Sequence, residues 1–149
     1  MPKSEYYEPK KLPGERPCPQ ILNDAEELYG LLLTAETMMT KVDKIRYNNR
    51  AVDQILDVIK EFVLAYDFED DREIHLKRMC ANVTVFIRTM RLINDRNIIH
   101  VFNPLETEKP DSVKMKIMEH LGKLDEGATR WKNSIINSRN KGTSGIAKQ

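Results

Sequence analysis

Five acidic side chains crowd one short segment of the chain and are its first candidates for chemistry. Asp67, Glu69, Asp70, Asp71 and Glu73 lie within seven residues, and carboxylate oxygens are ligands that Mg²⁺ prefers. All-helical nucleotide hydrolases, however, usually draw such carboxylates from two facing helices. Acidic residues in the first turn of a helix also interact favourably with its dipole. A metal-dependent nucleotide hydrolase built on Glu69, Asp70 and Asp71 is therefore a rival interpretation, and not the leading one.

Motifs of familiar enzyme sites do not occur in the sequence. The glycine-rich phosphate loop, HExxH, CxxC and the nucleophile elbow are all absent. His75, His100 and His120 are far apart, and none has the Glu-x-x-His spacing of di-iron bundles. We interpret them as surface or boundary residues. Cys18 and Cys80 are predicted to be free thiols. We therefore expect a protein that is not an enzyme and that holds no metal or cofactor.

Three basic residues are the strongest candidates for binding a partner. Lys77, Arg88 and Arg91 fall within an arc of about 60° on a helix, at about 100° per residue. Arg88 has no acidic residue three or four positions away. This basic arc suits contact with the phosphates of a polynucleotide or with a polymerase that carries it. A solvated helix face is the alternative, and the pattern alone does not separate the two.

A second basic stripe has a simpler explanation. Lys116, Lys123 and Arg130 follow one another at a spacing of seven residues, with Glu119 and Glu126 between them. Glutamate four residues before lysine or arginine forms a stabilising pair within a helix. Pairing within the helix is thus the leading interpretation of this stripe, and nucleic-acid or polymerase binding is the second.

Charge is unevenly divided along the chain, although the net charge is only +1. Residues 21–70 carry five Lys or Arg and eleven Asp or Glu, whereas residues 71–149 carry fifteen and nine. The basic second half indicates an acidic partner such as nucleic acid, or else attraction between the two halves of one domain. No apolar run in the sequence is long enough to span a membrane. Because residues 1–20 contain no hydrophobic stretch, we also expect no signal peptide and a cytoplasmic location.

Apolar residues recur at spacings of three and four, which predicts an all-α fold. We expect an antiparallel up-down four-helix bundle over residues 21–138. Its first helix should open at Asn23, with a polar break at Thr40–Lys44 before the second. The prolines at 9, 13 and 17 predict a flexible Pro-rich leader over residues 1–20. A flexible basic tail is predicted over residues 139–149.

The apolar positions also predict which side chains form the core. Trp131 lies on the seam of the fourth helix, so we expect it to be a core residue. Ile98 and Ile99, in the connector before that helix, are expected to fold over the bundle end. The expected stripe of the second helix is Ala51, Ile55, Ile59, Phe62 and Tyr66.

The third helix has one apolar strip more than a monomeric bundle needs. Ile74, Val85 and Leu92 lie nearly opposite its main apolar face, at about 100° per residue. A helix in a lone four-helix bundle buries a single face, so the second strip indicates a contact between subunits. We therefore predict a homo-oligomer.

Several segments together resemble one protein family. The run Met39–Lys44 is followed by a helix with Ala51, Ile55, Phe62 and Ala65, and later by Leu121–Gly127 and a tryptophan. Over about residues 21–142 the chain resembles the accessory variability determinant proteins of diversity-generating retroelements. The resemblance implies a four-helix bundle that assembles as a pentamer.

The same resemblance implies a function. Proteins of this family bind the retroelement reverse transcriptase and its template RNA, and they support mutagenic reverse transcription. Lys41 and Lys44 become candidate contact residues through the resemblance. We therefore expect a non-catalytic accessory subunit of such a complex. The alternative is a protein–protein scaffold without a nucleic-acid role.

Overall fold

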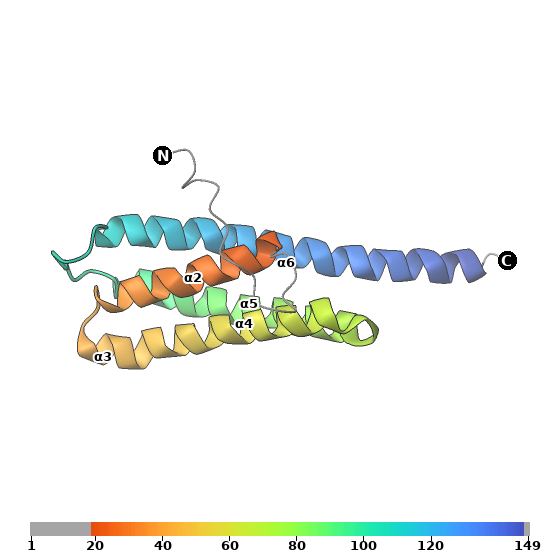
Figure 1. The fold of residues 1–149 in the computed structure, drawn as a ribbon, viewed down its shortest axis with the longest axis horizontal. Coiled ribbons are helices and arrows are strands. Elements are labelled where there is room, and N and C mark those ends of the chain that lie inside the picture. Colours follow the sequence, from red (N-terminus) through yellow and green to blue (C-terminus); the bar gives the residue numbers. More distant parts are fainter. Residues whose placement is uncertain (1–18, 148–149) are drawn as a thin grey trace, which may run out of the picture.

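The structure is a computed structural model that describes the backbone of residues 19–147 and the side chains of residues 19–140. This part of the chain contains four long helices and no strand (Figure 1). The all-α, four-helix prediction is thereby confirmed. The long helices are α2 (Gln20–Glu36), α4 (Asn49–Asp67), α5 (Arg72–Asp95) and α6 (Pro110–Ala147).

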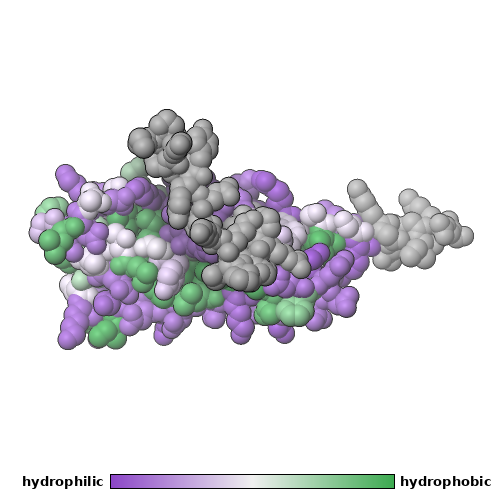
Figure 2. Space-filling model, in the orientation of Figure 1, coloured by the Kyte–Doolittle hydropathy of each residue, from purple (hydrophilic) through white to green (hydrophobic). Residues whose placement is uncertain are grey.

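Each long helix packs mainly against two others. The principal contacts join α2 to α4 and α6, and α5 to α4 and α6. In Figure 1 successive helices run in opposite directions, and α6 extends well past the start of α2. The connection between α4 and α5 is short, whereas residues 96–109 form a longer connector between α5 and α6. The face of the bundle drawn in Figure 2 is largely polar, with separate apolar patches.

The first helix begins one turn before the predicted start at Asn23. Pro19 is extended, with φ −68° and ψ 159°, and precedes the first helical residue. Its carbonyl accepts a hydrogen bond from the Asn23 backbone N–H at 3.1 Å, so Asn23 already lies within the helix. Gln20, assigned to the leader by the sequence, is therefore helical. The rest of the predicted leader, residues 1–18, lies outside the described residues.

The break after α2 also differs from its predicted position at Thr40–Lys44. The chain leaves helical geometry at residues 37–40 and resumes it at α3 (Lys41–Asp43). Thr40 is the N-cap, and its hydroxyl accepts a hydrogen bond from the Asp43 backbone N–H at 3.2 Å. A capping threonine starts a helix, which explains why the polar run after it is helical.

A π-helical turn, η1 (Lys44–Asn48), joins α3 to α4. In an uninterrupted α-helix, Lys44 would share the face of Ala51 and Ile55, which are fully buried. The wider turn rotates Lys44 outward, and its Nζ lies 3.8 Å from Glu36. Asn48 takes the inward position and donates from Nδ2 to the Leu32 carbonyl at 3.0 Å. The π-turn thus keeps an unpaired lysine out of the core.

The connector between α5 and α6 covers one end of the bundle, as predicted. Asn97 adopts a left-handed conformation, with φ 50°, just after α5 ends. Ile98 and Ile99 are buried. The backbone N–H groups of His100 and Val101 donate to the Met38 carbonyl at 3.0 and 2.8 Å. These bonds attach the connector to the chain just beyond α2.

Helix α6 carries the predicted seam and then continues further than expected. Leu121 and Leu124 are buried on it, whereas Trp131 is only partly buried against the core. The predicted flexible tail begins at residue 139, yet α6 runs to Ala147. An ion pair between Arg139 and Glu73 of α5 supports this extension. Residues 148 and 149 of the predicted tail lie outside the described part of the chain.

Candidate nucleic-acid and protein interface

The basic arc predicted on α5 is exposed, and two of its members form no ion pair with the described residues. Lys77 lies with its Nζ 3.4 Å from Glu73. Arg88 and Arg91 are exposed and pair with no described carboxylate. Residues 74–94 contain no Asp or Glu. This side of α5 therefore presents positive charge that the described residues do not neutralise.

The second apolar strip of α5 lies next to this arc. Ile74, Val85 and Leu92 are 53%, 50% and 50% exposed. They face away from the core, as their spacing predicts. On a helix of about 100° per residue, the basic residues lie roughly 40–120° around from the strip. We call the strip and the arc together the α5 outer face.

The basic stripe on α6 is neutralised within the described residues. Lys123 lies 3.2 Å from Glu119, and Arg130 pairs with Glu126, both within α6. Lys116 pairs with Glu108 of the connector. For Lys123 and Arg130 the structure thus contains the local pairs that the spacing predicts. Arginine and lysine already held by a carboxylate are weaker phosphate ligands than free ones, because binding must break the pair.

The two lysines suggested by family resemblance lie on another element. Lys41 opens α3 and is exposed, whereas Lys44 begins the π-turn and lies near Glu36. Neither is on α5 or α6. The structure therefore gathers Lys77, Arg88 and Arg91 on one helix face and does not add these lysines to that helix.

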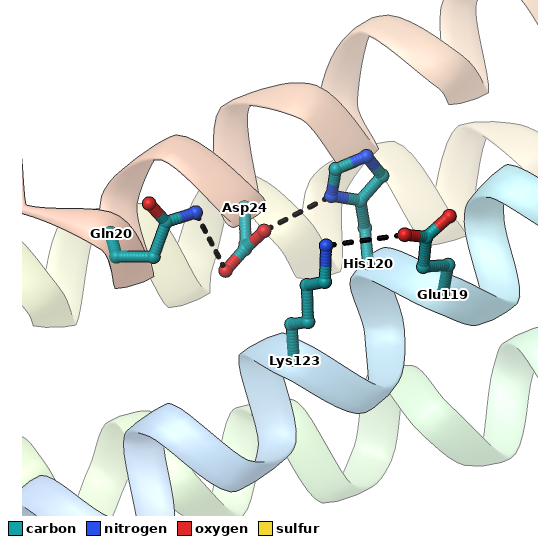
Figure 3. Close-up of polar contacts among 5 residues, drawn as sticks. All are labelled: Gln20, Asp24, Glu119, His120 and Lys123. Carbon is teal, nitrogen blue, oxygen red and sulfur yellow. Dashed lines mark hydrogen bonds and ion pairs between the residues drawn. The ribbon is translucent and has the colours of Figure 1, made fainter.

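Sequence reasoning missed a buried polar link between α2 and α6 (Figure 3). Asp24 is only 2% exposed. Its Oδ1 lies 3.0 Å from Nδ1 of His120, and its Oδ2 accepts from Gln20 at 3.4 Å. Asp24 shares a helix face with the buried Leu28, and a carboxylate on an apolar stripe is a signal that would have identified it.

A second histidine–carboxylate link joins α5 to α4. His75 Nδ1 lies 2.7 Å from Glu61 Oε2, and both side chains are mostly buried. His100 is exposed, and His75 and His120 are partly buried, so all three are surface or boundary residues as predicted. His75 and His120 also connect helices, which was not predicted. Neither link contains a hydroxyl or thiol nucleophile among its bonded partners in the described residues, so neither forms a catalytic triad.

The remaining candidates for chemistry are weak. Burial raises the pKa of the Cys80 thiol, and nearby Asp125 raises it too, although Lys132 lowers it. A raised pKa disfavours the reactive thiolate. Glu69, Asp70 and Asp71 form the exposed turn η2 (Glu69–Asp71). Across residues 19–140, no group of three or more acidic, histidine or cysteine side chains is placed to hold a metal ion.

No protein-family model, curated protein or solved structure matches the sequence. In the described part of the chain, none of the helices combines the length and the hydropathy required to cross a membrane. The α5 outer face is thus the candidate site on the evidence of its own geometry.

The Asp24–His120 link provides a test of how the bundle is held together. We expect Asp24→Asn and His120→Gln each to lower the free energy of unfolding by about 1.5–3 kcal/mol, the range for a hydrogen bond to a charged group. Because the two side chains contact each other directly, the double variant should lose less than the sum. Urea denaturation of the four proteins measures this coupling, and additive losses would contradict it.

Proposed function

We propose that this chain is a non-catalytic, cytoplasmic accessory subunit of a reverse transcriptase complex. It binds the reverse transcriptase and the template RNA of a diversity-generating retroelement and so supports mutagenic reverse transcription. The observation that carries this proposal is the α5 outer face, where Arg88 and Arg91 have no described partner beside an exposed apolar strip. The resemblance over residues 21–142 supplies the identity of the partners.

The charge on α5 supports the RNA part of the proposal. Phosphate contacts come from lysine and arginine, and each contact releases condensed counterions. Arg88 and Arg91 reach phosphates without first breaking a described ion pair. The stretch between Glu73 and Asp95 contains no carboxylate that would repel an RNA backbone.

The apolar strip supports the assembly part of the proposal. Ile74, Val85 and Leu92 are each about half exposed, and a second copy of the chain would cover them. An up-down bundle leaves this side of α5 free for such a contact. The pentamer implied by the family resemblance is the assembly we propose.

Two other functions are weaker. A scaffold without a nucleic-acid role would use the apolar strip, but it would not explain why Arg88 and Arg91 are exposed without a described ion-pair partner. A nucleotide hydrolase needs carboxylates that converge on a metal, whereas Glu69, Asp70 and Asp71 lie on one exposed turn. A reverse transcriptase gene and paired near-repeats beside the gene for this chain would favour the leading proposal over both.

The experiment that tests the proposal compares two triple variants in filter binding to a structured RNA over a salt series. Lys77→Gln, Arg88→Gln and Arg91→Gln together should reduce the slope of log affinity against log salt by about 1.4–1.8, at about 0.7–0.9 for each of Arg88 and Arg91. Lys77 already pairs with Glu73 and should add little. The helical circular dichroism should not change, because all three side chains are exposed.

The matched control removes the same charge from α6. Lys116→Gln, Lys123→Gln and Arg130→Gln break pairs that are already neutral, so the slope should stay close to that of the unmodified protein. Equal slopes for the unmodified protein and the α5 variant would reject α5 as the RNA contact. No salt-dependent binding in any of the proteins would favour the scaffold.

A further inference from the structure

A groove opens between the first turn of α2 and the middle of α6. It has a volume of about 730 Å³. Asp24 and Lys123, both drawn in Figure 3, line it. Its other lining residues are Gln20, Ile21, Glu126, Gly127, Arg130, Trp131 and Ser134. We call it the α2–α6 groove.

The groove exists because α6 continues to Ala147, well past the point where α2 begins beside it (Figure 1). The helices meet closely at Gly127, where a Cβ atom would lie 3.0 Å from Cγ1 of Ile21. One turn later, Trp131 lies beside the start of α2 at Gln20 and is only partly buried. Ile135, one turn further, is partly buried as well. The surface of α6 past the start of α2 thus contains two apolar side chains that are only partly buried, Trp131 and Ile135.

Trp131 is the aromatic residue that lines the groove. Its ring centroid lies 5.3 Å from that of Phe62, which is buried and does not line the groove. Proline-rich chains bind against aromatic side chains, and their extended conformation is already restricted before they bind. Proline also lacks a backbone N–H, so it packs on Trp131 without leaving a donor unpaired.

The sequence that joins the chain at this groove has the matching composition. Residues 1–18 lead directly into Pro19 and Gln20, and Gln20 is on the rim. They include Pro9, Pro13 and Pro17. An extended chain spans up to about 3.3–3.6 Å per residue, so this segment reaches the whole groove. A short tether also gives an effective concentration on the order of millimolar.

We propose that the α2–α6 groove is the docking site of the chain's own proline-rich segment, residues 1–18. Nucleic acid is disfavoured as the occupant because Lys123 and Arg130 at the groove are paired with Glu119 and Glu126. The docked segment would lie along α6, past the start of α2, and would cover Trp131. This inference does not depend on the proposed function, because α5 takes no part in it.

Trp131 reports on docking directly, because it is the sole tryptophan. The experiment measures acrylamide quenching of its fluorescence in the full chain and in a full-chain variant with Pro9→Ser, Pro13→Ser and Pro17→Ser. Losing the tethered occupant should raise the quenching constant about twofold or more. Pro104→Ser is the matched control, since this exposed proline lies in the connector, and its quenching should equal that of the unmodified chain.

A peptide with the sequence of residues 1–18 completes the test. Added at millimolar concentration to the triple variant, it should restore the low quenching constant. Equal quenching in the triple variant and the unmodified chain would overturn the proposal. Quenching of the unmodified chain that falls as protein concentration rises would identify a second copy as the occupant and would also overturn it.

Discussion

Replacing Phe62 by alanine is expected to lower the free energy of unfolding by about 3–5 kcal/mol, the usual loss for a buried phenylalanine. Phe62 is 2% exposed and lies between the rings of Trp131 on α6 and Tyr66 on α4. Its removal leaves a cavity between two helices and ends both ring contacts, each worth about 0.5–1.5 kcal/mol beyond burial. Urea denaturation followed by circular dichroism measures the loss.

The neighbouring residue provides the control. Val63→Ala changes the next position of the same helix, where the side chain is 40% exposed. We expect a change of no more than about 0.5 kcal/mol, as for surface substitutions in general. If Phe62→Ala and Val63→Ala cost the same, the core does not lie where the structure places it. The variants therefore test the rotation of α4 and not merely its helical content.

That rotation was only partly predictable from the sequence. The expected stripe on this helix included Ala51, Ile55 and Phe62, which are buried. It also included Ile59 and Tyr66, which are only partly buried, whereas Val58 and Ala65 are buried in their place. Apolar residues occupy more than one face of this helix, so spacing alone does not decide which of them point inward.

Features that depend on distant partners were not predictable. Asp24 and His120 are separated by 96 positions, and no local pattern connects them. The π-turn at Lys44–Asn48 follows from the need to turn Lys44 away from the core, and that need arises only after α4 has packed. Local signals such as the capping role of Thr40 were present in the sequence, and a capping analysis would have moved the break to its observed place.

The exposure of the second apolar strip was predicted better than the helix boundaries. Angular position on an ideal helix was enough to separate Ile74, Val85 and Leu92 from the core, because α5 is one continuous helix of 24 residues. The sequence also predicted the pairing of Lys123 and Arg130, which is local. It did not predict that Lys116 pairs with Glu108, because the connector brings that glutamate back to α6.

The apolar strip leads to the last prediction, which is that Val85→Lys dissociates an oligomer of the unmodified chain. Full burial of a large aliphatic side chain contributes about 1.5–3 kcal/mol. Ile74, Val85 and Leu92 are each about half exposed, so covering all three contributes roughly half of that per residue. Lysine at the middle position places an unpaired charge in the contact, near Arg88 of the same helix.

Light scattering of the purified proteins at micromolar concentration is the measurement. The unmodified chain should be an oligomer, and Val85→Lys should raise its dissociation constant at least about tenfold, which corresponds to about 1.4 kcal/mol. Leu56→Lys is the matched control, because Leu56 is 44% exposed on α4 and outside the strip. It should leave the assembly intact. A monomeric unmodified chain would refute the subunit contact, and dissociation by Leu56→Lys alone would move that contact to α4. Since Arg91 lies roughly 100–120° around α5 from the strip, assembly through the strip would leave Arg91 available to RNA. Loss of assembly without loss of the salt slope would therefore separate the two roles of this helix.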